Sequence, residues 1–165
     1  MKTAAVHCTA DAERVVEQYG DMLFQICLVM LRNPGDAEDA VQDTLIKYLQ
    51  KAPDFKSAEH EKAWLITVAS NRCRDMQRFW VRHPQMNLEE IHAYSCQPEH
   101  HDLLDALLEL PEKFRIVLLL YYVHGYQTVE IAAIIGKSAS AVKMRLSKGR
   151  KLLQKQIREG DWLYE

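Results

Sequence analysis

Residues 128–151 have the sequence TVEIAAIIGKSASAVKMRLSKGRK, and this stretch decides the fold of the C-terminal half of the chain. Ala132 is small enough to let two helices cross closely, and Gly136, four residues later, supplies a left-handed turn without a Cβ clash. Ser138 is suited to cap a new helix, and Val142, six residues beyond the glycine, is placed to pack that helix onto the first. This spacing predicts a helix-turn-helix.

The second helix of this motif is expected at residues 138–158, after a first helix at 127–135, and it is strongly basic. Eight basic side chains and no acidic ones lie between positions 137 and 158: Lys137, Lys143, Arg145, Lys148, Arg150, Lys151, Lys155 and Arg158. The whole chain has a formal net charge of only −2, so the positive charge is concentrated here. A helix of one charge sign in such a motif points to nucleic acid as a partner.

A helical wheel divides this second helix into an inward and an outward side. The inward side is narrow and consists of Val142, Leu146, Gly149 and Leu153. The outward side has Ser140, Met144, Ser147 and Lys151 at its centre, Lys143 and Arg150 along one edge, and Arg145 and Lys148 along the other. We expect such a helix to lie in a major groove, with the centre and Lys143 at base edges and the flanks on phosphates. A solvated basic helix without a partner is the alternative.

The rest of the chain is also expected to be helical, so the predicted fold class is all-α. In the first half, apolar side chains recur at helical spacing, and Asn33-Pro34 has the composition of a helix start. A loop at residues 52–57 separates the helix that begins there from a helix at 59–81. In the second half, a start at Pro111 and a stop before Gly125 favour a helix at 112–123 over a buried strand.

The helical pattern is lost between the two halves, where Pro98, histidines and scattered glutamates occur. We therefore expect two small helical domains, residues 1–82 and 102–165, joined by a flexible linker at 83–101. His92, Cys96, His100 and His101 lie together in this linker, but their spacing matches no standard zinc site, and metal binding there stays open.

Composition excludes several classes of protein. No apolar run approaches the roughly 18 residues of a membrane span, and the N-terminus does not resemble a signal peptide. Four cysteines without a CxxC pair fit reduced thiols in the cytoplasm, with Cys27 and Cys73 on apolar helical faces and therefore in the core. There is no Gly-rich phosphate loop and no nucleophile with a matched base, so we expect no enzyme, no cofactor and no metal site.

Charge is uneven in the first half as well. Positions 11–61 contain 11 acidic and 5 basic residues, which suggests a protein surface as a second partner besides a polyanion. In the helix at 59–81, one side is apolar and the opposite side carries Thr67, Asn71, Arg74 and Arg78 at steps of four, three and four. A basic, hydrogen-bonding face therefore backs onto a buried one.

Several motifs together resemble the extracytoplasmic-function group of RNA polymerase sigma factors. In the second half, LPEKFR at 110–115, GYQTVEIA at 125–132 and VKMRL at 142–146 resemble sigma region 4. In the first half, DAEDAVQDT at 36–44 resembles region 2.2, and AWL at 63–65 with Asn71, Asp75 and Arg78 downstream resembles regions 2.3 and 2.4. The likeness covers about residues 11–156, in the expected order, with a linker between the two motif sets.

This resemblance implies a subunit that brings core RNA polymerase to promoters. Region 2.2 of the family docks on the β′ clamp helices, which here would engage Asp36, Glu38, Asp39, Gln42 and Asp43. The minus-10 element would be opened and held by Phe55 and Lys56 in the loop and by Asn71, Arg74, Asp75 and Arg78 on the next helix. Region 4 would meet the β flap and bind the minus-35 element as duplex through Ser140, Lys143, Met144, Arg145, Ser147, Lys148, Arg150 and Lys151.

The resemblance also implies an anti-sigma factor as a partner, and leaves three alternatives. Phe55 is either a stacking platform for an unpaired base or a hydrophobic plug under its loop. The acidic tail at 161–165 packs against region 4 or contacts an anti-sigma factor. The runner-up function is a stand-alone helix-turn-helix regulator, which leaves the acidic helix and the second basic face unexplained. Gly149 inside the last helix departs from the family pattern, since glycine costs about 1 kcal/mol of helix propensity.

Overall fold

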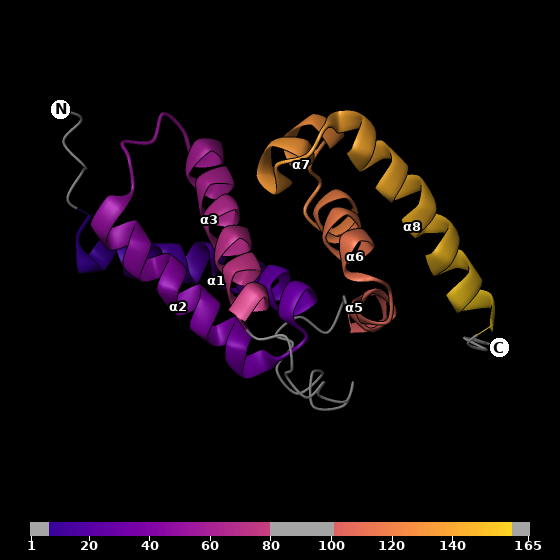
Figure 1. Ribbon diagram of the computed structural model, residues 1–165. Helices are drawn as coiled ribbons and strands as arrows, with labels where there is room; N and C mark the ends of the chain where they lie inside the picture. The colour runs from indigo at the N-terminus through magenta and orange to yellow at the C-terminus, as the bar shows by residue number, and fades with distance from the viewer. Residues whose placement is uncertain (1–6, 80–100, 160–165) are drawn as a thin grey trace. The chain divides into compact units, whose positions relative to one another are not determined.

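The computed structural model describes residues 7–79 and 101–159, and all regular elements within those ranges are helices (Figure 1). The chain divides into two compact units between residues 87 and 88, a position inside the expected linker. The first unit contains α1 (Thr9–Leu31), α2 (Pro34–Lys51) and α3 (Ala58–Phe79). The second contains α5 (His101–Leu108), α6 (Glu112–Leu118), the π-helical turn η2 (Leu119–Val123), α7 (Thr128–Ile135) and α8 (Ala139–Glu159). The all-α prediction is confirmed.

The tight connection between α1 and α2 follows from local sequence chemistry. Arg32 ends α1 in the left-handed conformation, with φ 54°, and its N–H still donates to the Leu28 carbonyl at 2.8 Å. Asn33 then caps α2 by accepting the Asp36 N–H on its side chain at 3.1 Å, and Pro34 occupies the first helical turn. The predicted helix start is therefore confirmed, because capping and the fixed φ of proline act together.

Each of the three helices of the first unit packs against the other two. The sides that meet are apolar: Val15, Leu23 and Ile26 of α1, Ala37 and Ala40 of α2, and Leu65 and Ala69 of α3 are fully buried. Cys27 and Cys73 are also fully buried, as the sequence predicted, and each is a free thiol. Their burial in neighbouring helices raises the pKa of the Cys27 thiol, chiefly through its hydrogen bond with Cys73 and then through desolvation.

A buried carboxylate fixes one end of this bundle. Glu61 of α3 is only 6% exposed, and its two oxygens accept from Arg14 of α1 at 2.6 and 3.1 Å. The Tyr48 hydroxyl of α2 donates to the same carboxylate at 2.8 Å. Desolvation pushes the pKa of Glu61 upward, but these hydrogen bonds outweigh it and leave the pKa below its ordinary value. One ionised side chain therefore ties three helices together, a contact that the sequence analysis did not predict.

The second unit has its own core, made of α5, α6 with η2, α7 and α8. Leu107, Leu108, Val117, Leu118 and Leu120 are essentially inaccessible to solvent. Arg115 is buried as well, and its guanidinium donates to the Leu108 and Leu110 carbonyls at 3.4 and 3.3 Å. These bonds satisfy backbone oxygens where α5 ends, and they join that end to α6.

The helix expected at 112–123 is correct in extent but wrong in type over its last five residues. After Leu118 it widens into η2, in which the His124 N–H bonds the Leu119 carbonyl, five residues back, at 3.3 Å. Gly125 then leaves the helix with φ 71°. The wider turn keeps Leu119 buried, whereas Tyr122 is half exposed. Such a turn has no periodic signature, so spacing alone predicts an ordinary α-helix.

The helix-turn-helix is confirmed in detail. Gln127 and Glu130 form a reciprocal cap at the start of α7, and Gly136 ends that helix in the left-handed conformation, with φ 69°. The Ser138 hydroxyl accepts the Ala141 N–H at 3.1 Å and so caps α8. Val142 is fully buried, as expected from its distance from the glycine. The turn therefore has the backbone conformation that its residues favour.

Gly149 has a packing reason that the sequence did not reveal. A Cβ at this position would lie 3.0 Å from Leu118 Cδ1 and 3.3 Å from Phe114 Cβ, both on α6. Contacts of that length are shorter than van der Waals packing allows. The glycine thus lets α8 approach α6 closely, which offsets the helix propensity that it costs.

We predict that Gly149→Ala lowers the free energy of unfolding by about 1–2 kcal/mol, since overpacking exceeds the gain in helix propensity. Thermal or urea unfolding followed by circular dichroism measures the change. Lys148→Ala, an exposed neighbour on the same helix, is the matched control and should change stability by less than about 0.5 kcal/mol. A higher unfolding temperature for Gly149→Ala would contradict the packing argument.

We predict that Glu61→Gln destabilises the first unit by about 1–3 kcal/mol at neutral pH, because Arg14 and Tyr48 lose a charged acceptor. The pKa of Glu61 is lowered in the folded state. Its stabilising contribution is therefore complete above the unfolded value of about 4.3 and is lost as the pH falls through the folded value. Urea titrations of both proteins at several pH values measure this difference.

The gap in unfolding free energy between the wild type and Glu61→Gln should be constant near neutral pH and should shrink in acid. Glu59→Gln removes an exposed carboxylate from the same helix and serves as the control. A gap that stays unchanged down to the lowest pH at which both proteins fold would show that the Glu61 charge does not hold the bundle.

Candidate nucleic-acid interface

The outward side of α8 is polar, basic and open to solvent. Its side chains belong to the set that the sequence predicted, and all but one are exposed: Ser140, Lys143, Met144, Ser147, Lys148, Arg150 and Lys151, with Arg145 half-buried. On the inward side Val142 and Leu146 are buried. We call the eight outward residues the basic face of α8. The helix therefore has the rotation that the helical wheel predicted.

Arg150 differs from the other cations of this face. Its Nη1 donates to the Tyr122 hydroxyl of η2 at 3.2 Å, and this hydrogen bond raises the pKa of Arg150. Tyr122 is half exposed, and its ring packs edge-to-face on Tyr121 with centroids 4.9 Å apart. The guanidinium is thus oriented by a tyrosine pair on a neighbouring element. The sequence analysis missed Tyr122, because η2 and α8 are far apart along the chain.

The outward side of α2 is acidic. Glu38, Asp39 and Gln42 are exposed, and Asp36 and Asp43 are half-buried. The opposite side of the helix is packed, with Ala40, Thr44 and Tyr48 essentially inaccessible, as α1 and α3 cover it. We call the five outward residues the acidic face of α2. A surface of this charge repels DNA and suits a cationic protein surface.

Asp43 is not equivalent to the rest of the acidic face. Its Oδ2 accepts from Arg72 Nε on α3 at 2.6 Å, and both side chains are 42% exposed. An ion pair with this much solvent access contributes at most about 1 kcal/mol. Asp43 therefore belongs to the acidic face and also links that face to α3.

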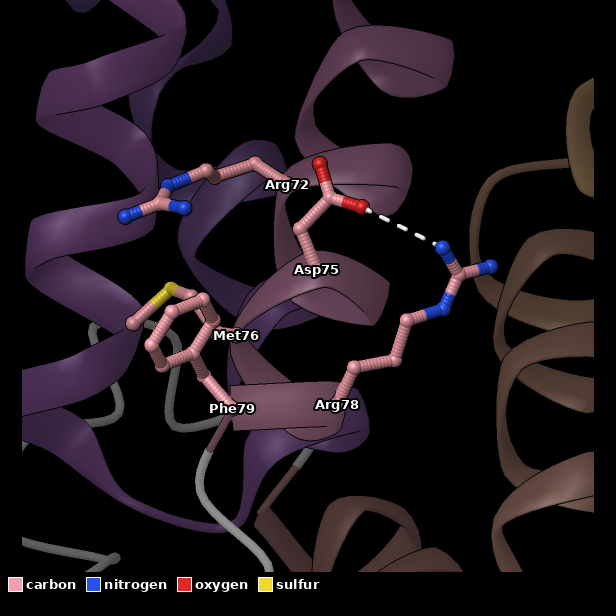
Figure 2. Close-up of a pocket in the computed structure, with 5 residues that line it drawn as sticks. All are labelled: Arg72, Asp75, Met76, Arg78 and Phe79. Atoms are coloured by element: carbon pink, nitrogen blue, oxygen red, sulfur yellow. Dashed lines mark ion pairs between the residues drawn. The ribbon is translucent and has the colours of Figure 1, made fainter.

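The polar residues of α3 lie along its outward side. Arg74 Nη1 donates to Asn71 Oδ1 at 2.7 Å, and Arg78 approaches Asp75 at 3.8 Å, the pair drawn in Figure 2. Asn71, Asp75 and Arg78 are exposed, and Arg74 is half-buried. All four of the predicted minus-10 residues on this helix therefore share one face, and two hydrogen-bonding or ionic pairs preorganise them.

A hollow of about 590 Å³ lies beside the C-terminal half of α3. It is lined by Arg72, Asp75, Met76, Arg78 and Phe79, all shown in Figure 2. The Phe79 ring is 90% exposed. An exposed aromatic ring between two arginines has the chemistry of a stacking site for an unpaired base. Arg72 and Phe79 were not among the predicted contacts, although they follow the helical spacing of Met76.

Phe55 and Lys56, which were predicted from the loop, have different environments. Lys56 is exposed. Phe55 is half-buried in an aromatic cluster, stacked on Tyr48 with centroids 6.1 Å apart and edge-on to Trp64 at 5.7 Å. His60 meets the same ring edge-on at 5.3 Å. Part of the Phe55 ring is therefore already occupied by protein contacts.

Two other features can be located only in part. The described residues contain no group of three or more His, Cys, Asp or Glu arranged to hold a metal ion. His92, Cys96 and His100 lie outside the described residues, as does the acidic tail at 161–165. Within residues 7–79 and 101–159, no helix has the length and apolarity needed to cross a membrane.

Two family models match this chain, and they match separate parts of it. Residues 15–79 match sigma-70 region 2, which covers almost all of α1 to α3. Residues 100–153 match sigma-70 region 4, which covers α5 to most of α8. The two matches coincide with the two units.

Curated proteins with similar sequences extend along both units. The ECF RNA polymerase sigma factor SigW of Bacillus subtilis is 27% identical over 164 residues, which is 88% of each chain. The RNA polymerase sigma factor CarQ of Myxococcus xanthus is 30% identical over 138 residues, which is 79% of each chain.

Two solved structures share the fold. The sigma factor RpoE of Bartonella quintana, crystallised with the anti-sigma factor NepR, has a TM-score of 0.71 at 24% identity over 91% of this chain and 98% of that one. CnrH, solved with the cytosolic domain of CnrY, has a TM-score of 0.67 at 25% identity over 93% of this chain and 91% of that one.

Proposed function

The chain belongs to the extracytoplasmic-function group of RNA polymerase sigma factors, and from that membership we propose how its exposed faces divide the work of transcription initiation. A sigma factor joins core RNA polymerase and directs it to a promoter. The observation that carries the assignment is the separation of opposite charges, with an acidic face on α2 in one unit and a basic face on α8 in the other. A stand-alone helix-turn-helix regulator would leave the whole first unit without a role.

The acidic face of α2 is the surface for core polymerase in this proposal, through the β′ clamp helices. Glu38, Asp39 and Gln42 are exposed on a helix whose other side is packed, so a partner can cover them without disturbing the core. Complementary charge would speed the encounter and set the register of docking. The second unit would contact the β flap, as in other members of the family.

The basic face of α8 would bind the minus-35 element as duplex DNA. Its width and rotation suit a helix whose outward centre enters the major groove. Lys143 and Ser140 lie where base edges would be read, and Lys148 and Arg150 lie where phosphates would be held. The hydrogen bond from Arg150 to Tyr122 supports this role, because it orients the guanidinium before DNA arrives.

The outward side of α3 would hold the opened minus-10 strand, with Asn71, Asp75 and Arg78 on bases and backbone. The hollow beside these residues supports the assignment, since it combines two arginines with an exposed aromatic ring. Lys56 would meet a phosphate. In this proposal Phe55 mainly supports the loop from below, because Tyr48 and Trp64 already pack on its ring.

We further propose that the protein acts in the cytoplasm, catalyses no reaction itself and is regulated by an anti-sigma factor. Two similar sigma factors were solved with such partners, RpoE with NepR and CnrH with CnrY. No cofactor or metal is required for any of the assigned contacts.

Run-off transcription with purified core polymerase over a promoter library tests the proposed function directly. Transcripts that share a two-part motif are the expected result, and they define the DNA for later binding assays. No specific transcript above the level of core polymerase alone would refute it.

We predict that Lys143→Ala weakens binding to the selected minus-35 duplex by about 1–3 kcal/mol and relaxes sequence preference. Lys148→Ala is the matched control, because loss of a phosphate contact should weaken all sequences about equally and reduce the salt slope by about one. Fluorescence anisotropy at several salt concentrations measures both. If the two variants behave alike, Lys143 contacts only the backbone.

We predict that Asp39→Arg abolishes assembly with core polymerase and leaves duplex binding by the second unit unchanged. A reversed charge at the centre of the acidic face would repel a cationic partner, and like-charge contacts cost several kcal/mol. Co-purification with core polymerase measures assembly. Glu17→Arg makes the same charge change at an exposed position of α1 and should assemble normally. Normal assembly of Asp39→Arg would remove the acidic face from the interface.

A further inference from the structure

One arginine of the first unit belongs to two surfaces at once. Arg72 pairs with Asp43 of the acidic face, with Nε 2.6 Å from the carboxylate oxygen. The same side chain lines the hollow beside α3, together with Asp75, Arg78 and Phe79 (Figure 2). The assigned polymerase surface and the assigned minus-10 surface are therefore joined through a single ion pair.

We propose that Arg72 is an additional DNA-binding residue that Asp43 holds in the free protein and releases when core polymerase binds. Asp43 exchanges its partner for a cationic side chain of polymerase, and Arg72 then binds a phosphate of the opened strand at the hollow. The proposal rests on the polymerase surface assigned to α2, and it adds a link between that surface and DNA.

The exposure of the pair makes this exchange inexpensive. Both side chains are 42% accessible, so solvent already screens their attraction and neither is committed to the core. Arg14 is a useful contrast, because its partner Glu61 is 6% exposed and accepts two hydrogen bonds from it. That pair holds the bundle, whereas the pair of Arg72 with Asp43 can open without exposing apolar surface.

Asp43 affects DNA binding in two ways while it holds Arg72. It occupies Nε of the guanidinium, which otherwise can present a two-pronged contact to phosphate. It also places a negative charge next to the path of an anionic strand. A polymerase cation on Asp43 would remove both effects, and the number of ion pairs would be conserved.

The link must act in both directions. If polymerase raises the affinity of the first unit for the opened strand, bound strand raises the affinity for polymerase by the same factor. An exposed ion pair limits that factor to about fivefold or less. The device therefore favours DNA contacts within the assembled enzyme without abolishing them elsewhere.

The first experiment uses the free full-length chain and a fluorescein-labelled single-stranded oligothymidylate. Asp43→Asn should bind this probe about 2- to 5-fold more tightly than wild type, because Arg72 is released. Asp39→Asn makes the same charge change on the same helix, leaves the pair intact, and should change affinity by less than about 1.5-fold. Arg72→Gln in the Asp43→Asn background should remove the gain. The second unit is identical in all variants, so its contribution cancels.

The second experiment compares the free chain with the assembled polymerase. Arg72→Gln should change binding of the free chain to the oligothymidylate by less than about 1.5-fold, but should weaken open-complex formation by the assembled enzyme about 3- to 5-fold. Arg78→Gln is the control, since Arg78 is 79% exposed and 3.8 Å from Asp75, and it should weaken DNA binding in both states. Melting temperatures verify that each variant folds.

The proposal is overturned if Asp43→Asn and Asp39→Asn bind the oligothymidylate equally, or if the gain survives without Arg72. It is also overturned if Arg72→Gln weakens the free chain as much as the assembled enzyme. The oligothymidylate measurements need no polymerase, so their failure would leave the polymerase surface on α2 standing. Failure of Asp39→Arg to disrupt assembly would remove that surface by itself.

Discussion

The two units are too small to surround α2, α3 or α8, so each of these helices packs on one side and leaves the other in solvent. The packed side sets the rotation of the helix about its own axis, and that rotation decides which side chains a partner can meet. In α8, Val142 and Leu146 are buried and Gly149 lies against α6, which turns the basic side outward. The same constraint turns the acidic side of α2 and the polar side of α3 outward.

Polar contacts between the helices of the first unit differ in permanence. The carboxylate of Glu61 is buried with three hydrogen bonds from Arg14 and Tyr48, so breaking them would leave a buried charge uncompensated. Asp43 and Arg72 form an equally short contact at the edge of the bundle, where water replaces either partner at little cost. Distance alone does not separate a structural tie from an exchangeable one, whereas burial does.

The sequence predicted what depends on neighbours along the chain. The Asn33 cap, the left-handed Gly136, the Ser138 cap and the rotation of α8 all follow from spacing and local backbone chemistry. The sequence did not predict the pairing of Arg14 with Glu61, 47 positions apart, or of Asp43 with Arg72, 29 apart. Periodicity says which side of a helix is polar but not which polar groups of another helix lie opposite. Gly149 shows the same limit, because its reason lies on α6.

The π-helical turn at Leu119–Val123 has a consequence for the evolution of this segment. It holds one residue more than an α-helical path of the same rise. Loss of a single residue would restore regular winding and rotate everything downstream by about 100° relative to α6. The basic face would then be aimed elsewhere, although neither α7 nor α8 had changed. Homologues that keep this architecture should therefore vary here in side chains but not in length, so that an alignment of them is free of gaps across these five positions.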